Sequence, residues 1–157
     1  MQTLAASPDR VDEALVDPAF LVRMAELPKL GSAEVLSQSR TGNVVVQQVR
    51  YLFRAELSGA VTKVVDPDRL TWVEDSTVDL RAHATRCEIK PDAYANLLAG
   101  RYDARVEPDG DGARRIITGT LKVKVPLVGG KVERAIVSGL QENAAAQATL
   151  LDEHLAG

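Results

Sequence analysis

The feature that most constrains the fold of this chain is a change of hydrophobic period. The stretch KVKVPLVGGKVERAIVSGL, residues 122–140, begins with a strict alternation of polar and apolar side chains. Beyond Gly129 and Gly130 the apolar residues recur at helical spacing instead. The pattern therefore predicts a strand that turns a corner at the glycine pair and continues directly into a long helix.

The predicted helix covers about 130–155 and carries an apolar stripe that needs a surface to pack on. A helix of about 25 residues spans roughly 38 Å, which is enough to cross a twisted sheet from rim to rim. Small residues near its middle, Gly139 and the run 144–146, either let a sheet approach closely or leave volume for another molecule. The stripe consists of Val132, Ile136, Leu140, Ala144, Leu151 and Leu155.

Most of the chain before this helix has the period of two that is typical of antiparallel strands with one apolar face. Turn signals rich in Gly, Pro, Asn and Asp at 41–43, 66–68 and 107–112 separate the alternating segments. After a short first strand at 3–6, the expected strands cover 33–40, 43–57, 70–79, 81–89, about 101–107 and 114–125.

Two short helices are expected between the first strand and the rest of the sheet. Ser7 followed by Pro8 predicts the start of a helix over about 8–15, and Asp17 followed by Pro18 predicts a second one. The order indicates an α+β fold, in which a curved antiparallel sheet of about six or seven strands wraps around the long C-terminal helix.

Length and charge exclude several classes of protein. The 157 residues suit a single domain, residues 1–157, and no apolar run approaches the ~18 residues of a membrane span. The net charge of −3 and the absence of long basic runs argue against a nucleic-acid partner. A single cysteine and an N-terminal stretch without signal-peptide character favour the cytoplasm. Monomer and homodimer remain open.

The element order, together with KVKVPLVGGKVERAI leading into the final helix, resembles the START-like helix-grip superfamily, also called SRPBCC or Bet v 1-like. More narrowly, residues 123–136 resemble a bacterial branch of that superfamily whose function is unknown. The break at Asp17-Pro18 and the sequence Gly100-Arg101-Tyr102 before a late strand support the likeness. The likeness of topology covers nearly the whole chain.

This resemblance implies a hydrophobic cavity between the sheet and the long helix. Members of the superfamily bind lipids, sterols, polyketides or other apolar molecules there, and a minority catalyse cyclisation or dehydration. The superfamily supplies no fixed catalytic motif to transfer to this chain, so no catalytic residue and no cofactor is expected.

Candidate ligand-binding residues lie on the inward strand faces that this fold implies and on the helix stripe. Such aromatic and aliphatic side chains either line the cavity or pack as an ordinary core. Gln47 shares the face of Val45 and Val49, so it either bonds a neighbour or orients a ligand. The predicted ligand-binding residues are Gln47, Tyr51, Phe53, Trp72, Tyr102, Leu121, Ile136 and Leu140.

Patterns of catalytic or metal-binding residues are weak. His83 and Cys87 lie four residues apart on one expected strand, about 13 Å from each other, so they cannot form a catalytic pair. Two histidines and one cysteine without ligand spacing predict no metal site. Glu74 is a candidate acid or base only if it is buried in the cavity, and its charged neighbours favour a surface position.

The sequence therefore predicts a binding protein for a small hydrophobic or amphipathic ligand, such as a lipid, a polyketide or an isoprenoid-like molecule. One alternative is an enzyme similar to polyketide cyclases and aromatases. Another is a protein-interaction module whose interior is filled by its own side chains.

Overall fold

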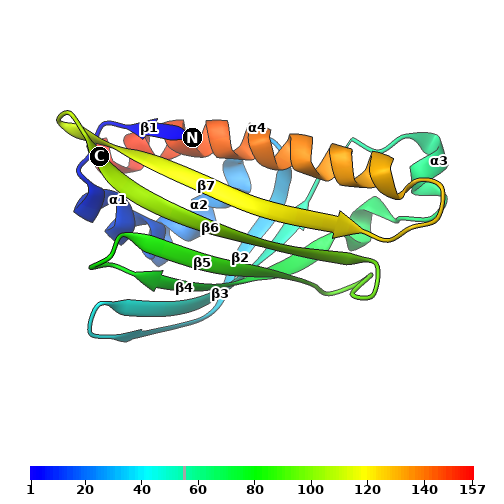
Figure 1. Ribbon diagram of the computed structural model, residues 1–157, viewed down its shortest axis with the longest axis horizontal. Helices are drawn as coiled ribbons and strands as arrows, with labels where there is room; N and C mark the ends of the chain where they lie inside the picture. Colours follow the sequence, from blue (N-terminus) through cyan, green and yellow to red (C-terminus); the bar gives the residue numbers. More distant parts are fainter. Residues whose placement is uncertain (55) are drawn as a thin grey trace.

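The computed structural model describes residues 1–54 and 56–157. Its seven strands form one curled antiparallel sheet (Figure 1). The strands follow one another in the order β1-β7-β6-β5-β4-β3-β2. Their bounds are β1 Gln2–Leu4, β2 Leu30–Thr41, β3 Val44–Phe53, β4 Thr71–Asp79, β5 Ala84–Pro91, β6 Leu98–Asp109 and β7 Gly112–Val123.

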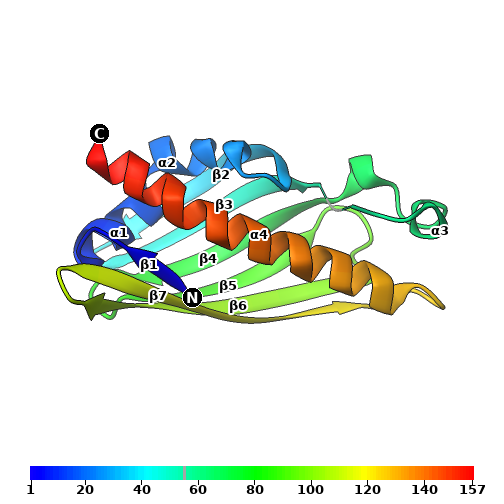
Figure 2. The same ribbon diagram turned by 90° about the horizontal axis from the view of Figure 1, so that it is seen from above.

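The longest helix lies diagonally across the concave face of this sheet, and the two first helices lie near one end of it (Figure 2). This arrangement confirms the expected α+β helix-grip fold. The helical elements are α1 Pro8–Leu15, α2 Pro18–Arg23, η1 Met24–Glu26, α3 Gly59–Thr62, η2 Pro67–Arg69 and α4 Gly129–Ala156.

The two helices between β1 and β2 begin where the sequence predicts. Ser7 has extended backbone geometry and is followed by Pro8 in the first turn of α1. The side chain of Asp17 accepts a hydrogen bond of 2.9 Å from the backbone N–H of Ala19 at the start of α2. This cap satisfies an N–H group that the first turn of α2 cannot pair, whereas the side chain of Ser7 makes no capping hydrogen bond among the described residues.

Several expected strands have different ends in the structure, and two of them are shortened where other local structure takes over. The strand expected over 43–57 ends at Phe53, and α3 and η2 follow before β4 begins; residue 55 lies outside the described residues. The strand expected from 81 begins at Ala84, because the carboxylate of Asp79 accepts hydrogen bonds from the N–H groups of Arg81 and Ala82 and forms a turn.

Small residues in α4 serve both of the purposes that the sequence left open. A Cβ atom at Gly139 would lie 2.5 Å from the ring of Phe53 on β3, so the helix approaches the sheet closely at this point. Ala144 and Ala145, further along the same helix, line an internal cavity instead. At the start of α4, the N–H of Gly129 donates to the carbonyl of Val125 and closes the corner.

Within the described residues, no helix combines the length and apolar character needed to cross a membrane.

Candidate ligand-binding cavity

A cavity of about 640 Å³ lies between the concave face of the sheet and α4. Residues of six consecutive strands, β2 to β7, form one wall, and α4 forms the opposite wall. Apolar side chains make up much of the lining. They include Leu21, Leu27, Leu30, Tyr51, Trp72, Val78, Ile89, Ile117, Leu121 and Leu140.

Six of the eight predicted ligand-binding residues line this cavity: Gln47, Tyr51, Trp72, Tyr102, Leu121 and Leu140. Phe53 and Ile136 lie outside its lining, and both are completely buried in the packed core. The ring of Phe53 stacks on Trp72 with 5.0 Å between ring centroids, at the point where Gly139 brings α4 close. Contact of any of these residues with a ligand remains a prediction.

The lining residues that reach the protein surface lie mainly on β7 and α4. Thr118, Gly119 and Thr120 are exposed on β7, and Val137 and Gln141 are exposed on α4. β1 pairs with residues 113–115 of β7, and beyond residue 115 no other described residue pairs with the outer edge of this strand. We therefore place the entrance of the cavity between this edge and α4.

Glu74 is an acidic side chain inside the cavity. On β4 it stands between Trp72 and Ser76, and all three side chains line the cavity. Burial raises the pKa of the Glu74 carboxyl, while the polar hydrogens of Tyr102, Trp72 and Cys87 and the charge of Arg115 act in the opposite direction. The surface position favoured by the sequence is therefore wrong, because residues at even positions of β4 face inward together with Trp72.

The hydrogen-bonding groups closest to Glu74 are neutral, and the charge of Arg115 acts on it from across the same cavity. The thiol of Cys87 lies 3.7 Å from its carboxylate. Burial raises the pKa of this thiol and raises the pKa of both Tyr51 and Tyr102 well above the ordinary phenol value. Cys87 is thus held as a thiol and is a poor nucleophile, and the tyrosines remain protonated donors.

Arg115 is a buried cation on the inward face of β7, with only 4% of its surface exposed. Its Nη1 donates hydrogen bonds to the side-chain oxygens of Gln2 at 3.2 Å and Gln147 at 3.0 Å. Its Nε is buried and has no hydrogen-bond partner among the described residues. The guanidinium is therefore held by neutral amides on β1 and α4.

Other inward polar groups are satisfied by the protein itself. Gln47 donates to the carbonyl of Leu15 at 3.2 Å and accepts from Gln38 at 2.9 Å, so it bonds its neighbours. Asn143 on α4 accepts a hydrogen bond of 2.9 Å from the backbone N–H of Lys29. These two side chains connect the cavity wall to the segment that contains α1, α2 and the start of β2.

Sequence reasoning missed Glu74, Arg115 and Gln147 as cavity residues. The signal for the first two was present in the alternation of the strands. Glu74 lies two residues after Trp72, and Arg115 lies two residues before Ile117 and six before Leu121, so each shares a strand face with apolar residues. Because charged residues usually lie at the surface, this expectation was preferred over the alternation pattern. Gln147 gave a comparable signal, because it lies three residues after Ala144 and four before Leu151, within the apolar stripe of the helix.

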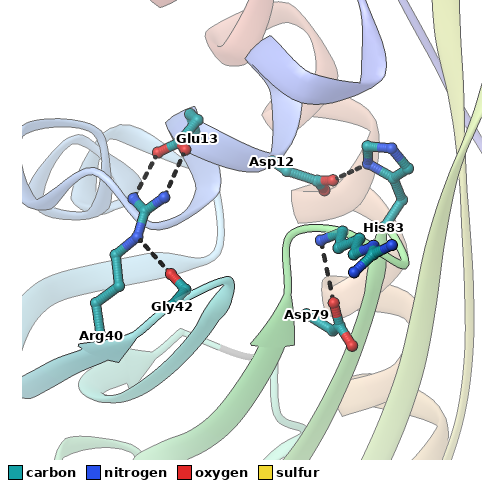
Figure 3. Close-up of polar contacts among 7 residues, drawn as sticks. Asp12, Glu13, Arg40, Gly42, Asp79 and His83 are labelled. Carbon is teal, nitrogen blue, oxygen red and sulfur yellow. Dashed lines mark hydrogen bonds and ion pairs between the residues drawn. The ribbon is translucent and has the colours of Figure 1, made fainter.

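A second polar cluster lies outside the cavity and joins α1 to two turns of the sheet (Figure 3). Nδ1 of His83, in the turn before β5, forms a hydrogen bond with the buried carboxylate of Asp12. Arg40 makes two hydrogen bonds of 3.1 Å with Glu13 and one of 3.3 Å with the carbonyl of Gly42. These charged residues pair with one another, and the cluster stabilises the packing of α1.

His154, near the C-terminal end of α4, is largely covered. Its Nε2 lies 3.2 Å from the carboxylate of Asp17, and its ring packs edge-on against Phe20 with 5.3 Å between centroids.

A curled antiparallel sheet that holds a long helix over an internal cavity defines a helix-grip protein. Within this class, the chain belongs to the family described as "Protein of unknown function (DUF2505)", whose profile matches residues 1–155. No curated protein matches the chain.

Several solved structures share the fold. The protein TTHA0849 from Thermus thermophilus is 21% identical over 99% of this chain and 93% of its own, with a TM-score of 0.71. The ZhuI aromatase/cyclase from Streptomyces sp. R1128 is 13% identical over 98% of this chain and 89% of its own, with a TM-score of 0.65. Ara h 8.0201 is 14% identical over 98% and 93%, with a TM-score of 0.58. Identities this low establish the shared fold alone.

Proposed function

We propose that this chain is a START-like protein of one domain, residues 1–157, that binds a small hydrophobic or amphipathic molecule between the sheet and α4. The observation that carries the proposal is the cavity of about 640 Å³. Small-molecule sites typically enclose about 300–1,000 Å³, with mostly apolar walls and a few placed polar groups. The candidate ligand classes are a lipid, a polyketide or an isoprenoid-like molecule.

Burial of apolar surface would supply most of the binding energy. At about 25 cal/mol per Å², a ligand that buries about 200 Å² of apolar surface gains roughly 5 kcal/mol from this term. The polar groups on the wall, Glu74, Tyr102 and Arg115, would then decide how the ligand is oriented.

Native mass spectrometry of gently purified protein tests this function first. A discrete adduct that is released on denaturation, followed by solvent extraction and identification, would establish the binding function and the ligand class. The same spectrum reports whether the protein is a monomer or a homodimer. A mass without adduct, combined with no uptake of the neutral probe N-phenyl-1-naphthylamine, would favour the protein-interaction module.

A substitution on α4 locates the binding to the cavity. Ala144 lines the cavity, so Ala144→Phe would fill part of it and should weaken uptake of the probe. Thr149 is exposed on the same helix, and Thr149→Phe is the matched control that should leave uptake unchanged. Equal uptake by both variants would place the probe elsewhere.

Glu74 favours a second candidate function, a cyclase-like enzyme. A carboxyl group inside a cavity can take a proton from a carbon beside a carbonyl group or return one to an oxygen, as cyclisation and dehydration require. The structural likeness to the ZhuI aromatase/cyclase supports this candidate at the level of fold. The neutral phenol of Tyr102, close to Glu74, would donate a hydrogen bond to the carbonyl oxygen.

Proton exchange at a simple ketone separates the enzyme from a passive carrier. The apolar ketone 2-undecanone in deuterated buffer reports removal of its α-protons by nuclear magnetic resonance. The enzyme hypothesis expects faster exchange with the wild-type protein and loss of this acceleration in Glu74→Gln, with Glu88→Gln on the outer face of β5 as control. The same exchange rate with all three proteins would eliminate this candidate.

A further inference from the structure

The protein satisfies only part of the hydrogen-bonding capacity of the Arg115 guanidinium among the described residues. Its side chain lines the cavity although 96% of the residue's surface is covered. Among residues 1–54 and 56–157, no carboxylate oxygen lies within 4.0 Å of its guanidinium, and its charge acts only at longer range on the carboxyls of Glu74 and Asp12, where it opposes the pKa rise that burial causes. A cation removed from water in this way is costly unless an anion or a full set of hydrogen bonds compensates it.

The amide groups around Arg115 orient it without neutralising it. Gln2 donates from Nε2 to the carbonyl of Ala144 at 2.6 Å and to the side-chain oxygen of Gln147 at 2.9 Å. Nε2 of Gln147 points to the sulfur of Met24 at 3.4 Å. Both amide oxygens are thereby turned toward Nη1 of Arg115, whereas its buried Nε has no hydrogen-bond partner in the part of the chain that the structure describes.

The free Nε side of a guanidinium suits a carboxylate, because Nε and its neighbouring amino group form the planar fork that binds two oxygens at once. From Arg115, the inward positions of β7 continue through Ile117 and Gly119 to Leu121, a distance of about 20 Å for six residues of strand. An apolar chain can follow these positions along the cavity wall.

We propose that Arg115 binds the carboxylate of an apolar acid whose hydrocarbon part extends along β7 toward Leu121. This inference rests on the proposed binding function and makes it more specific, because it names the ligand as an anion with one charged end. Glu74 is the opposing group: it faces the same cavity and, when ionised, repels a bound carboxylate.

Paired ligands test the inference without any substitution. Dodecanoic acid and 1-dodecanol share a chain and differ in charge, and each competes with N-phenyl-1-naphthylamine for the cavity of the wild-type protein. We expect dodecanoate to bind about 10- to 100-fold more tightly at pH 7.5, since hydrogen bonds to charged groups are worth this much. Equal affinity for acid and alcohol would overturn the inference while leaving the binding function intact, and no binding of probe, acid or alcohol would overturn both.

Variants of neighbouring residues assign the preference to Arg115. Arg115→Gln should remove the preference for the acid, so that dodecanoate binds no more tightly than 1-dodecanol to this variant. Arg114→Gln is the matched control, because Arg114 points away from the cavity lining and pairs with Glu107 at 3.2 Å. Glu74→Gln should raise the affinity for dodecanoate, because it removes the opposing charge. A preference that survives in Arg115→Gln, or that disappears in Arg114→Gln, would refute the assignment.

Discussion

Glu74 lies inside this protein because alternate residues of a strand point to the same side of the sheet. Its neighbours along β4, Val73 and Asp75, face outward, while Trp72 and Ser76 line the cavity with it. Such a carboxyl must lose much of its hydration when it ionises, which is why burial raises its pKa. The same group is therefore a source of instability and the candidate acid or base.

Glu74→Gln should stabilise the protein at neutral pH. The folded protein holds the proton of Glu74 more tightly than the unfolded chain, whose carboxyl has the ordinary pKa of 4.5. The stability of the wild type therefore falls as the pH rises from about 4.5 through the raised pKa of Glu74. Between these two pKa values the free energy of unfolding decreases by about 1.4 kcal/mol per pH unit. The variant should match the wild type at pH 4 and exceed it at pH 7.

Urea unfolding at pH 4, 5.5 and 7 measures this difference. Glu88→Gln serves as the control, because Glu88 is exposed on the outer face of the neighbouring strand. A stability difference between wild type and Glu74→Gln that does not change with pH would contradict the buried position of this carboxyl.

The buried carboxylate of Asp12 depends on His83, which lies in the turn between β4 and β5 with a φ of 55°. His83→Gly keeps this backbone conformation without strain and removes the ring, so Asp12 loses a partner while it is 2% exposed. The free energy of unfolding should fall by about 1–3 kcal/mol. Ala82→Gly, at an exposed position of the same turn, should cost clearly less in the same urea titration.

The contact between α4 and β3 depends on the absence of a side chain at Gly139. In Gly139→Ala the added methyl group would overlap the ring of Phe53, which is stacked on Trp72 and cannot move freely. Overpacking of this kind costs about 1–3 kcal/mol, more than the helix gains from alanine. Thermal unfolding should show a lower midpoint for this variant.

Gly130→Ala is the control within the same helix. Gly130 is exposed, and a Cβ atom there would approach only the end of the Arg134 side chain, at 3.3 Å. This variant should be as stable as the wild type or up to about 1 kcal/mol more stable, since alanine favours helix over glycine. Equal midpoints of thermal unfolding for Gly139→Ala and Gly130→Ala would contradict the close approach of α4 to β3 at Gly139.

The interior as a whole combines a packed core with a hollow region, and two positions one helical turn apart on α4 distinguish them. Ile136 is completely buried outside the cavity lining, whereas Leu140 is half-buried and lines the cavity. Ile136→Ala should cost about 2–5 kcal/mol, the range for a packed aliphatic side chain. Leu140→Ala should lower the free energy of unfolding much less, because the cavity already leaves empty space on one side of this side chain.

Chemical denaturation of the ligand-free protein compares these two variants directly. Full core-sized losses at both positions would indicate a filled interior and would favour the protein-interaction module over the binding function.

Local patterns in the sequence were sufficient for the fold and for most of the cavity wall. The alternation of β3, β4 and β7 predicts which side chains share a face, because successive residues of a strand point to opposite sides. The helical period after Gly130 predicts a cover for that sheet, and the structure confirms both. Six of the eight predicted residues accordingly line the cavity.

The placement of charges and the division between core and cavity depended on tertiary structure. Gly139 excludes Phe53 and Ile136 from the cavity wall by bringing α4 onto β3, a contact between segments far apart in sequence. Arg115 lies inside only because amides of β1 and α4 meet there to hold it. Parity along a strand carries no information on which distant groups will solvate a buried charge, because the curl of the sheet and the position of the helix bring those groups together.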